Sequence, residues 1–126
     1  MVSFGRTRRR EGVSKLNGPP LLVLTSLASG PKHGHALLKD IQTFTGERLG
    51  AGTLYGAIAR LEERGLIAAL PEQDRRRPYR LTPAGAALFR EVIAEMDHVI
   101  GVGKTRLAFL ASPPGPETDA AQGRLG

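Results

Sequence analysis

The chain has 126 residues, a formal net charge of +6 and a pI of about 10.5. This length accommodates one domain with flanking tails, and the basic excess favours a polyanionic partner, either nucleic acid or an acidic membrane surface. The sequence contains no cysteine, which excludes disulfides, thiolate zinc sites and cysteine catalysis in this chain and fits a reducing cytoplasm. No apolar run approaches the ~20 residues of a membrane-spanning helix. Since no apolar region follows the basic start, we expect a cytoplasmic protein.

The first part of the chain predicts a basic arm followed by a buried helix. Residues 1–15 are polar, basic and aperiodic, so we expect a flexible arm. Pro19 and Pro20 suit the first turn of a helix. That helix is apolar on most sides and therefore central to a core, and Gly30-Pro31 ends it. Its apolar residues are Leu21, Leu22, Leu24, Leu27 and Ala28.

Two further helices are predicted next. The second runs from about His33 to Thr45, with Gly46 as its stop. The third follows a glycine-marked turn at Gly50 and ends at a second glycine, Gly65. It has an apolar face with 3.6-residue spacing, made of Leu54, Ile58 and Leu61. The opposite face carries Thr53, Gly56 and Arg60. Thirteen residues give a rod of about 20 Å, which suits a DNA major groove.

A basic hairpin is predicted directly after the third helix. Residues 66–70 are strand-like, residues 71–77 form a charged turn, and Tyr79-Arg80-Leu81 alternates as a return strand. A helix followed by a basic wing is typical of winged-helix DNA binding. The predicted fold class is therefore mainly α with a small β-hairpin: a winged helix-turn-helix over residues 16–82, plus a C-terminal dimerisation helix.

The last predicted helix covers residues 83–111, with Thr82 as its cap and Pro83 at its first position. Its length, roughly 42 Å, exceeds the size of its own domain. Apolar residues recur at spacings of four and three, interrupted by Gly103, so the stripe requires a second chain. We therefore predict a homodimer joined through Phe89, Ile93, Met96, Ile100, Leu107 and Leu110. The alternative is a helix that breaks at Gly101 or Gly103 and folds back on its own core. Residues 112–126, which follow the helix, are expected to be disordered.

Four blocks of the sequence, in order, resemble the PadR family of bacterial transcriptional regulators, in its short branch. They are residues 27–37, Gly52-Thr-Leu-Tyr55, residues 61–67 and residues 79–85. The resemblance implies a winged-helix dimer that binds a pseudo-palindromic operator, usually represses, and in some members releases DNA on binding a small compound. His35 departs from the tyrosine common at its position. Because the chain has no tryptophan, the tryptophan-lined drug pocket of some relatives is not carried over.

The candidate DNA-binding residues come from three elements. Thr53 and Tyr55 lie at the start of the third helix, and Arg60 lies further along its outer face. Lys32 and His33 precede the second helix, whose first amides would hold a phosphate together with Lys32. The wing residues Arg75, Arg76 and Arg77 would meet phosphate or a narrow minor groove. The competing interpretations are a core role for Tyr55, a solvated turn for the arginine run, and an ordinary surface position for Arg60.

A small-molecule effector site is a further hypothesis. It would lie between the first and last helices and be lined by Leu21, Leu24, Val92 and Met96, although core packing alone also explains these residues.

No enzyme or metal site is predicted. Gly101-Val-Gly-Lys-Thr105 imitates the end of a P-loop without its leading glycine, and Gly50-Ala-Gly52 lacks the third glycine of a dinucleotide fingerprint. His33 and His35 lack further ligands, so we expect no metal and no cofactor. Two rival functions remain: a winged-helix module for protein interaction or ligand binding without DNA, and a basic peripheral membrane protein, for which the folded part offers no insertion helix.

Overall fold

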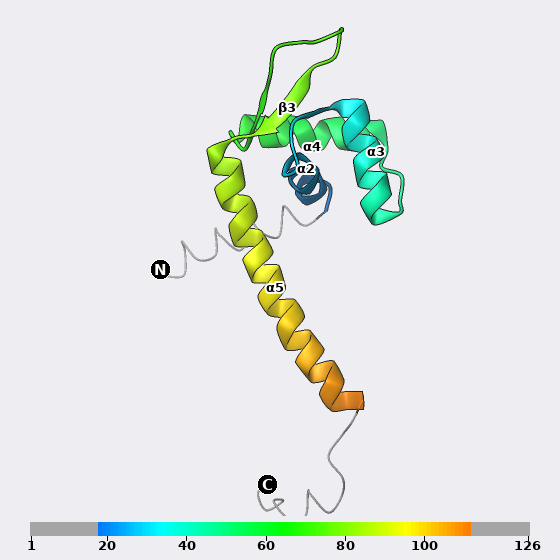
Figure 1. The fold of residues 1–126 in the computed structure, drawn as a ribbon, viewed down its shortest axis with the longest axis vertical. Helices are drawn as coiled ribbons and strands as arrows, with labels where there is room; N and C mark the ends of the chain where they lie inside the picture. Colours follow the sequence, from blue (N-terminus) through cyan, green and yellow to red (C-terminus); the bar gives the residue numbers. More distant parts are fainter. Residues whose placement is uncertain (1–17, 112–126) are drawn as a thin grey trace, which may run out of the picture. The chain divides into compact units, whose positions relative to one another are not determined.

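The computed structural model describes residues 18–111, so the predicted arm and tail at 1–15 and 112–126 lie outside the described residues. The elements in chain order are α2 (Pro19–Leu27), β1 (Lys32–His33), α3 (Gly34–Thr45), α4 (Ala51–Glu63), β2 (Ile67–Ala69), β3 (Pro78–Leu81) and α5 (Pro83–Ala111) (Figure 1). The chain divides into two compact units, one ending at Val92 and one beginning at Ile93.

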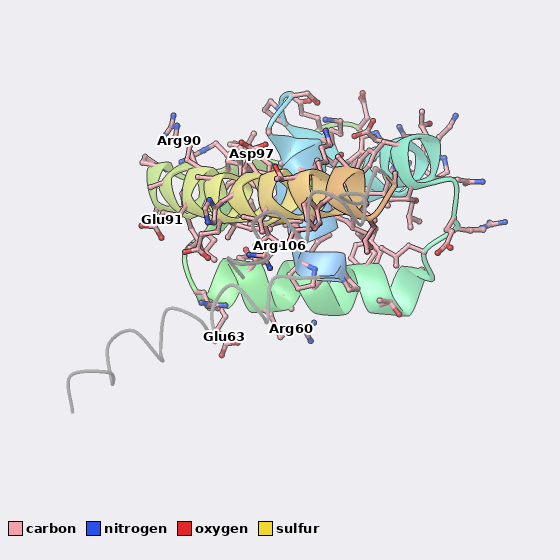
Figure 2. The ribbon with its side chains drawn as sticks, turned by 90° about the horizontal axis from the view of Figure 1, so that it is seen from below. Arg60, Glu63, Arg90, Glu91, Asp97 and Arg106 are labelled. Carbon is pink, nitrogen blue, oxygen red and sulfur yellow. The ribbon has the colours of Figure 1, made fainter. Side chains whose placement is uncertain are left out.

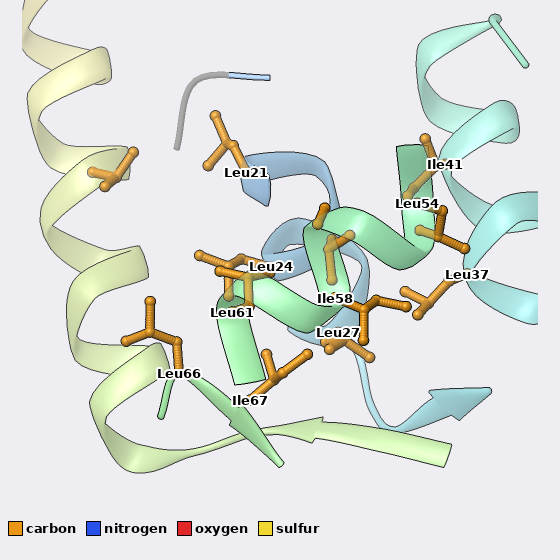
Figure 3. Close-up of a cluster of buried hydrophobic side chains, with 13 residues drawn as sticks. Leu21, Leu24, Leu27, Leu37, Ile41, Leu54, Ile58, Leu61, Leu66 and Ile67 are labelled. Carbon is orange, nitrogen blue, oxygen red and sulfur yellow. The ribbon is translucent and has the colours of Figure 1, made fainter. Parts of the chain in front are cut away.

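The core of the first unit forms where α2, α3 and α4 meet. Leu24, Leu37 and Leu54 have no exposed surface and come from these three helices. Figure 3 shows these side chains in one cluster, which also contains Ile67 of β2. The apolar faces predicted from helical spacing are therefore the buried faces, and α2 is the central helix because it is apolar on most sides.

The predicted helix ends are confirmed by the backbone. Gly46 caps α3 with φ 79°, and Gly65 follows α4 with φ 73°, a left-handed conformation that glycine adopts without steric cost. Leu66 N donates back to Leu61 O at 2.9 Å, which closes the end of α4 and turns the chain into β2. Thr82 Oγ1 accepts from Gly85 N at 3.0 Å, which caps the first turn of α5 as predicted.

The sheet contains a strand that the sequence did not indicate. β1 pairs antiparallel with β3, which also pairs with β2, giving the order β1-β3-β2. α3 begins at Gly34, one residue after the predicted start at about His33. His33 is extended (φ −85°, ψ 169°), pairs with Pro78 and serves as the N-cap of α3. A two-residue strand is too short to show an alternating pattern.

The wing is a tight hairpin at its tip. Gln73 and Arg76 exchange backbone hydrogen bonds of 2.7 and 2.8 Å, which leaves Asp74 and Arg75 as the two turn residues. Both have positive φ, 50° and 65°, as a type I′ turn requires. Glycine and asparagine usually occupy such positions, so an arginine here is held in a costly conformation at the apex of the wing.

The last helix is continuous. α5 runs for 29 residues, a length of about 43 Å, and both Gly101 and Gly103 are helical. The alternative in which the helix breaks at these glycines is therefore wrong. Helix-forming neighbours on both sides offset the roughly 1 kcal/mol that each glycine costs in a helix interior.

Candidate nucleic-acid interface

The outer face of α4 presents the predicted recognition residues to solvent. Thr53 and Arg60 are exposed, while Leu54 and Ile58, on the other face, are buried. In Figure 2 the Arg60 side chain extends outward from the helix. Tyr55 is 49% exposed and does not belong to the core cluster, so the competing interpretation of Tyr55 as a core aromatic is wrong.

Residues from four parts of the fold surround one cavity of about 220 Å³, which we call the wing hollow. β1, the start of α3, the first half of α4 and the wing each contribute to it. Its lining residues are His33, Gly34, His35, Tyr55, Arg75, Arg76, Arg77 and Tyr79. The fold therefore gathers most of the predicted DNA-binding residues in one place, although they are far apart in the sequence. None of the lining residues is acidic, so the hollow suits an anion.

Tyr55 lies directly over the first residue of α3. A Cβ atom placed on Gly34 would overlap the Tyr55 hydroxyl and lie 2.7 Å from the ring carbon that bears it. Gly34 is itself buried. The absence of a side chain at Gly34 thus creates the space that brings Tyr55 from α4 against the entry to α3, at the edge of the wing hollow.

His33 lies between α3 and the wing. Its Nδ1 accepts from Ala36 N at 3.3 Å, and its Nε2 lies 3.2 Å from Arg76 Nη1. Arg77 is held differently, because its Nη1 donates to Leu70 O at 3.2 Å within the wing. Arg75 occupies the turn, so the three wing arginines have three different settings.

Tyr79 is a residue of the wing hollow that the sequence analysis did not select. It lies in the middle of the sheet, opposite Lys32 on one side and Ala69 on the other. Burial raises the pKa of Tyr79 above its usual 10.0, and Glu62 and Tyr55 raise it further, while Arg77 lowers it. Tyr79 is therefore a neutral hydroxyl at physiological pH. His35 also lines the wing hollow and was not selected. Tyr79 and His35 both belong to sequence blocks that resemble the family, which was the available signal.

Lys32 has a different setting from the one predicted. Its Nζ donates to Ser29 Oγ at 2.7 Å and to the carbonyl oxygens of Ser26 and Gly30, at the end of α2. Lysine near a helix C-terminus satisfies carbonyls that have no partner in the helix. Since Ala36 N donates to His33 Nδ1, one of the amides predicted to hold a phosphate beside Lys32 already has an acceptor within the protein.

The predicted dimer residues fall into two groups. Phe89 is half-buried and packs against the core of the first unit, so its apolar surface is used within its own chain. The members from Ile93 onward are exposed, from 36% for Met96 to 73% for Leu110. Val99, Val102 and Phe109 are also exposed apolar residues of α5 that the spacing analysis missed. Val99 lies beside the heptad seam, whereas Val102 and Phe109 lie on another side of the helix. Charged residues such as Asp97 and Arg106 occupy other positions of the helix (Figure 2).

The hypothetical effector residues belong mainly to the core. Leu21, Leu24 and Val92 are buried members of the core cluster, with exposed fractions of 8%, 0% and 1%. Met96 belongs to the second unit. Core packing therefore explains the first three, and an effector site at these residues stays a prediction.

The described residues contain neither a metal-ligand group nor a membrane-spanning helix. Within residues 18–111, no three metal-ligating side chains of the His, Cys, Asp or Glu type are grouped as a metal site would need. None of the helices in that range is both long enough and apolar enough to cross a membrane.

Comparison with known proteins identifies the family. The model of the "Transcriptional regulator PadR-like family" matches residues 23–91, which is more than half of the chain. The chain is 34% identical over 97 residues to the transcriptional regulator Rv3488 of Mycobacterium tuberculosis, covering 66% of this chain and 90% of that protein. It is 45% identical over 87 residues to an uncharacterized 37.1 kDa protein in transposon TN4556 of Streptomyces fradiae. That match covers 69% of this chain and only 25% of the Streptomyces protein.

A solved structure of a PadR family transcriptional regulator from Eggerthella lenta agrees with the fold. Its TM-score is 0.59 at 30% identity, covering 86% of this chain and 97% of that chain. The family consists of transcriptional regulators and not of enzymes, in agreement with the sequence analysis. The chain belongs to the PadR-like family of transcriptional regulators.

Proposed function

We propose that the protein is a sequence-specific DNA-binding repressor that acts as a homodimer in the cytoplasm and contacts DNA through α4 and the wing. The observation that carries this proposal is the wing hollow, where side chains from α3, α4 and the wing form one cationic surface. The exposed residues Thr53, Tyr55 and Arg60 would read base edges in the major groove. Arg75, Arg76 and Arg77 would contact phosphates or enter a minor groove, which positions the protein and supplies affinity.

The exposed apolar residues of α5 support a dimer. Exposed apolar side chains on a helix of this length are typical of a surface that a partner covers. A two-fold dimer binds two half-sites whose centres are about 34 Å apart, or a multiple of that distance, on a pseudo-palindromic operator. The family resemblance supports repression, with release by a small effector as its regulation.

DNA binding is tested by selecting bound oligonucleotides from a random pool and titrating the enriched sequence at several salt concentrations. If six to ten phosphates are engaged per dimer, log affinity should fall against log salt with a slope of about −5 to −9. Replacing Arg75, Arg76 and Arg77 by alanine should weaken binding to all sequences and make the slope shallower.

The matched control replaces Arg64, Arg80 and Arg90, which are exposed and lie outside the wing hollow. It removes the same net charge, so it separates local contacts from the overall field. Equal effects of the two triple variants would remove the wing from the interface. A pool without any enriched motif would favour the alternative, a winged-helix module for protein interaction or ligand binding.

The dimer is tested with a pair of substitutions in α5. Leu107→Asp places a charge on the predicted apolar seam. The exposed residue Ala94 lies on the opposite side of the helix, next to Arg90, Glu91 and Asp97, and Ala94→Asp places the same charge there. Sedimentation at micromolar concentration should give a monomer for the first and a dimer for the second. A monomeric unmodified protein at that concentration would exclude the dimer.

Repression and effector release are tested by a reporter gene placed under the selected operator.

A further inference from the structure

The imidazole of His33 lies between two N–H donors. Ala36 N points to Nδ1 at 3.3 Å, and Arg76 Nη1 lies 3.2 Å from Nε2. A neutral imidazole has one acceptor nitrogen and one N–H, and an arginine side chain only donates. His33 therefore accepts from only one of these two groups, and its other nitrogen carries a proton that faces a donor.

The backbone decides which nitrogen accepts. Ala36 N is fixed in the first turn of α3 and is partly buried, so it depends on the His33 side chain as its acceptor. Arg76 is an exposed side chain that reaches water by changing rotamer. Nδ1 is therefore the acceptor and Nε2 carries the proton. Consequently Nε2–H and the Arg76 guanidinium are two donors that lie 3.2 Å apart, and a shared acceptor between them would remove their repulsion.

The surroundings favour an anionic acceptor. His33 and Arg76 both line the wing hollow, together with Tyr55, Arg75 and Arg77, and the lining contains no carboxylate. A phosphate oxygen accepts from two donors at once and is stabilised by the charge of the arginine. DNA binding requires no backbone change at either donor, because β1 pairs with β3 at His33 and holds α3 against the wing.

We propose that His33 Nε2–H and Arg76 form a two-donor clamp for one oxygen of a phosphate group, with the DNA backbone as its source. This inference rests on the DNA-binding function proposed above and specifies one of its contacts. His33 then has two roles: its Nδ1 caps α3, and the same bond fixes the tautomer that presents Nε2–H to the phosphate. The α3 cap and the phosphate contact of the wing are thereby coupled through one ring.

Three variants separate the two roles of His33. His33→Asn keeps a strong N-cap for Ala36 N, but its shorter amide lacks the donor next to Arg76. His33→Ala loses both the cap and the donor. Arg76→Gln removes the other half of the clamp. Arg80→Gln is the matched control, because Arg80 is exposed on β3, donates to Leu81 O and does not line the wing hollow.

Affinity for the selected DNA is measured by fluorescence anisotropy at several salt concentrations. We expect His33→Asn and Arg76→Gln each to weaken binding about tenfold, as the loss of a charge-assisted hydrogen bond does. Arg76→Gln should also make the salt slope shallower by about 1.8, because each of the two protomers loses one phosphate contact that contributes about 0.9. The double variant should lose far less than the hundredfold product, because both groups hold one oxygen. If His33→Asn bound the selected DNA with wild-type affinity, the clamp would be overturned while the proposed DNA-binding function stayed intact.

The tautomer gives an independent readout. Nitrogen-15 NMR of the unmodified protein should show the His33 proton on Nε2, and titration with the selected DNA should shift that nitrogen. A proton on Nδ1 would overturn the inference. Inorganic phosphate and DNA with single neutral methylphosphonate linkages distinguish the sources. A shift with DNA that one such linkage abolishes identifies a backbone phosphate. A shift with inorganic phosphate in a protein that binds no DNA would retain the clamp, as a site for a free oxyanion, and refute the proposed function.

Discussion

Gly85 and Gly101 both lie within α5, and alanine substitutions at these two positions should have opposite effects on stability. A Cβ atom on Gly85 would overlap the Leu66 carbonyl oxygen and lie 2.9 Å from the carbonyl carbon. A Cβ atom on Gly101 would have no atom within 4 Å other than those of its own helix and immediate neighbours. Gly85 is therefore required by a close approach of two backbones, whereas Gly101 lowers helix stability without any such contact.

The magnitude for Gly85→Ala follows from the contacts at this junction. Leu66 O accepts from Thr82 N at 3.1 Å, and Thr82 Oγ1 donates to Gly65 O at 2.7 Å, so α5 begins on the turn between α4 and β2. Displacing the Leu66 carbonyl adds an overpacking cost of about 1–3 kcal/mol and weakens a hydrogen bond that contributes about 1 kcal/mol. The higher helix propensity of alanine returns up to about 1 kcal/mol. The net loss in the free energy of unfolding is about 2 kcal/mol.

Gly101→Ala should instead raise the free energy of unfolding by up to about 1 kcal/mol. The assay is urea unfolding followed by far-UV circular dichroism at one fixed protein concentration, because a dimer makes the midpoint depend on concentration. A loss of 2 kcal/mol lowers the midpoint by about 1 M urea. A Gly85→Ala protein that unfolds at the wild-type midpoint would refute the contact with Leu66. If Gly101→Ala destabilised the protein, α5 would be close-packed at that position.

Arg75→Gly should stabilise the wing by about 1 kcal/mol, since glycine adopts the φ of 65° without strain. The same substitution should weaken DNA binding, because it removes the guanidinium. Arg75→Asn controls for the change in backbone strain, and unchanged DNA affinity in Arg75→Gly would contradict a DNA contact by Arg75. The raised pKa of Tyr79 means that the folded state holds this proton more tightly than the unfolded state. This contribution to stability is present below pH 10 and is lost as pH rises through the folded pKa. Absorbance titration of a Tyr55→Phe variant isolates Tyr79, and a midpoint at or below 10 would contradict its burial. Lys32→Gln should cost about 1–2 kcal/mol of stability without changing the salt slope of DNA binding; a shallower slope would restore Lys32 as a phosphate ligand.

Local patterns in the sequence were sufficient for most of the fold. The spacing of Leu54, Ile58 and Leu61 gave the buried face of α4, since a helix repeats every 3.6 residues whatever surrounds it. Gly46 and Gly65 marked helix ends because their conformations follow from the lack of a Cβ atom. The wing and its arginines were likewise visible as a charged turn between two strands.

The tertiary structure decided which of these residues meet. His33 and Arg76 are 43 positions apart, and only the pairing of β1 with β3 brings them to 3.2 Å. Phe89 has the spacing of the dimer seam but packs into the core of its own chain, because the start of α5 lies against that core. Lys32 is as cationic as any phosphate ligand, yet the end of α2 takes all of its described hydrogen bonds. The charge of a residue and the helical spacing of apolar residues are properties of single residues and short segments, so the sequence alone determines them. The partner of a side chain depends on how the chain folds between distant segments, so only the tertiary structure determines it.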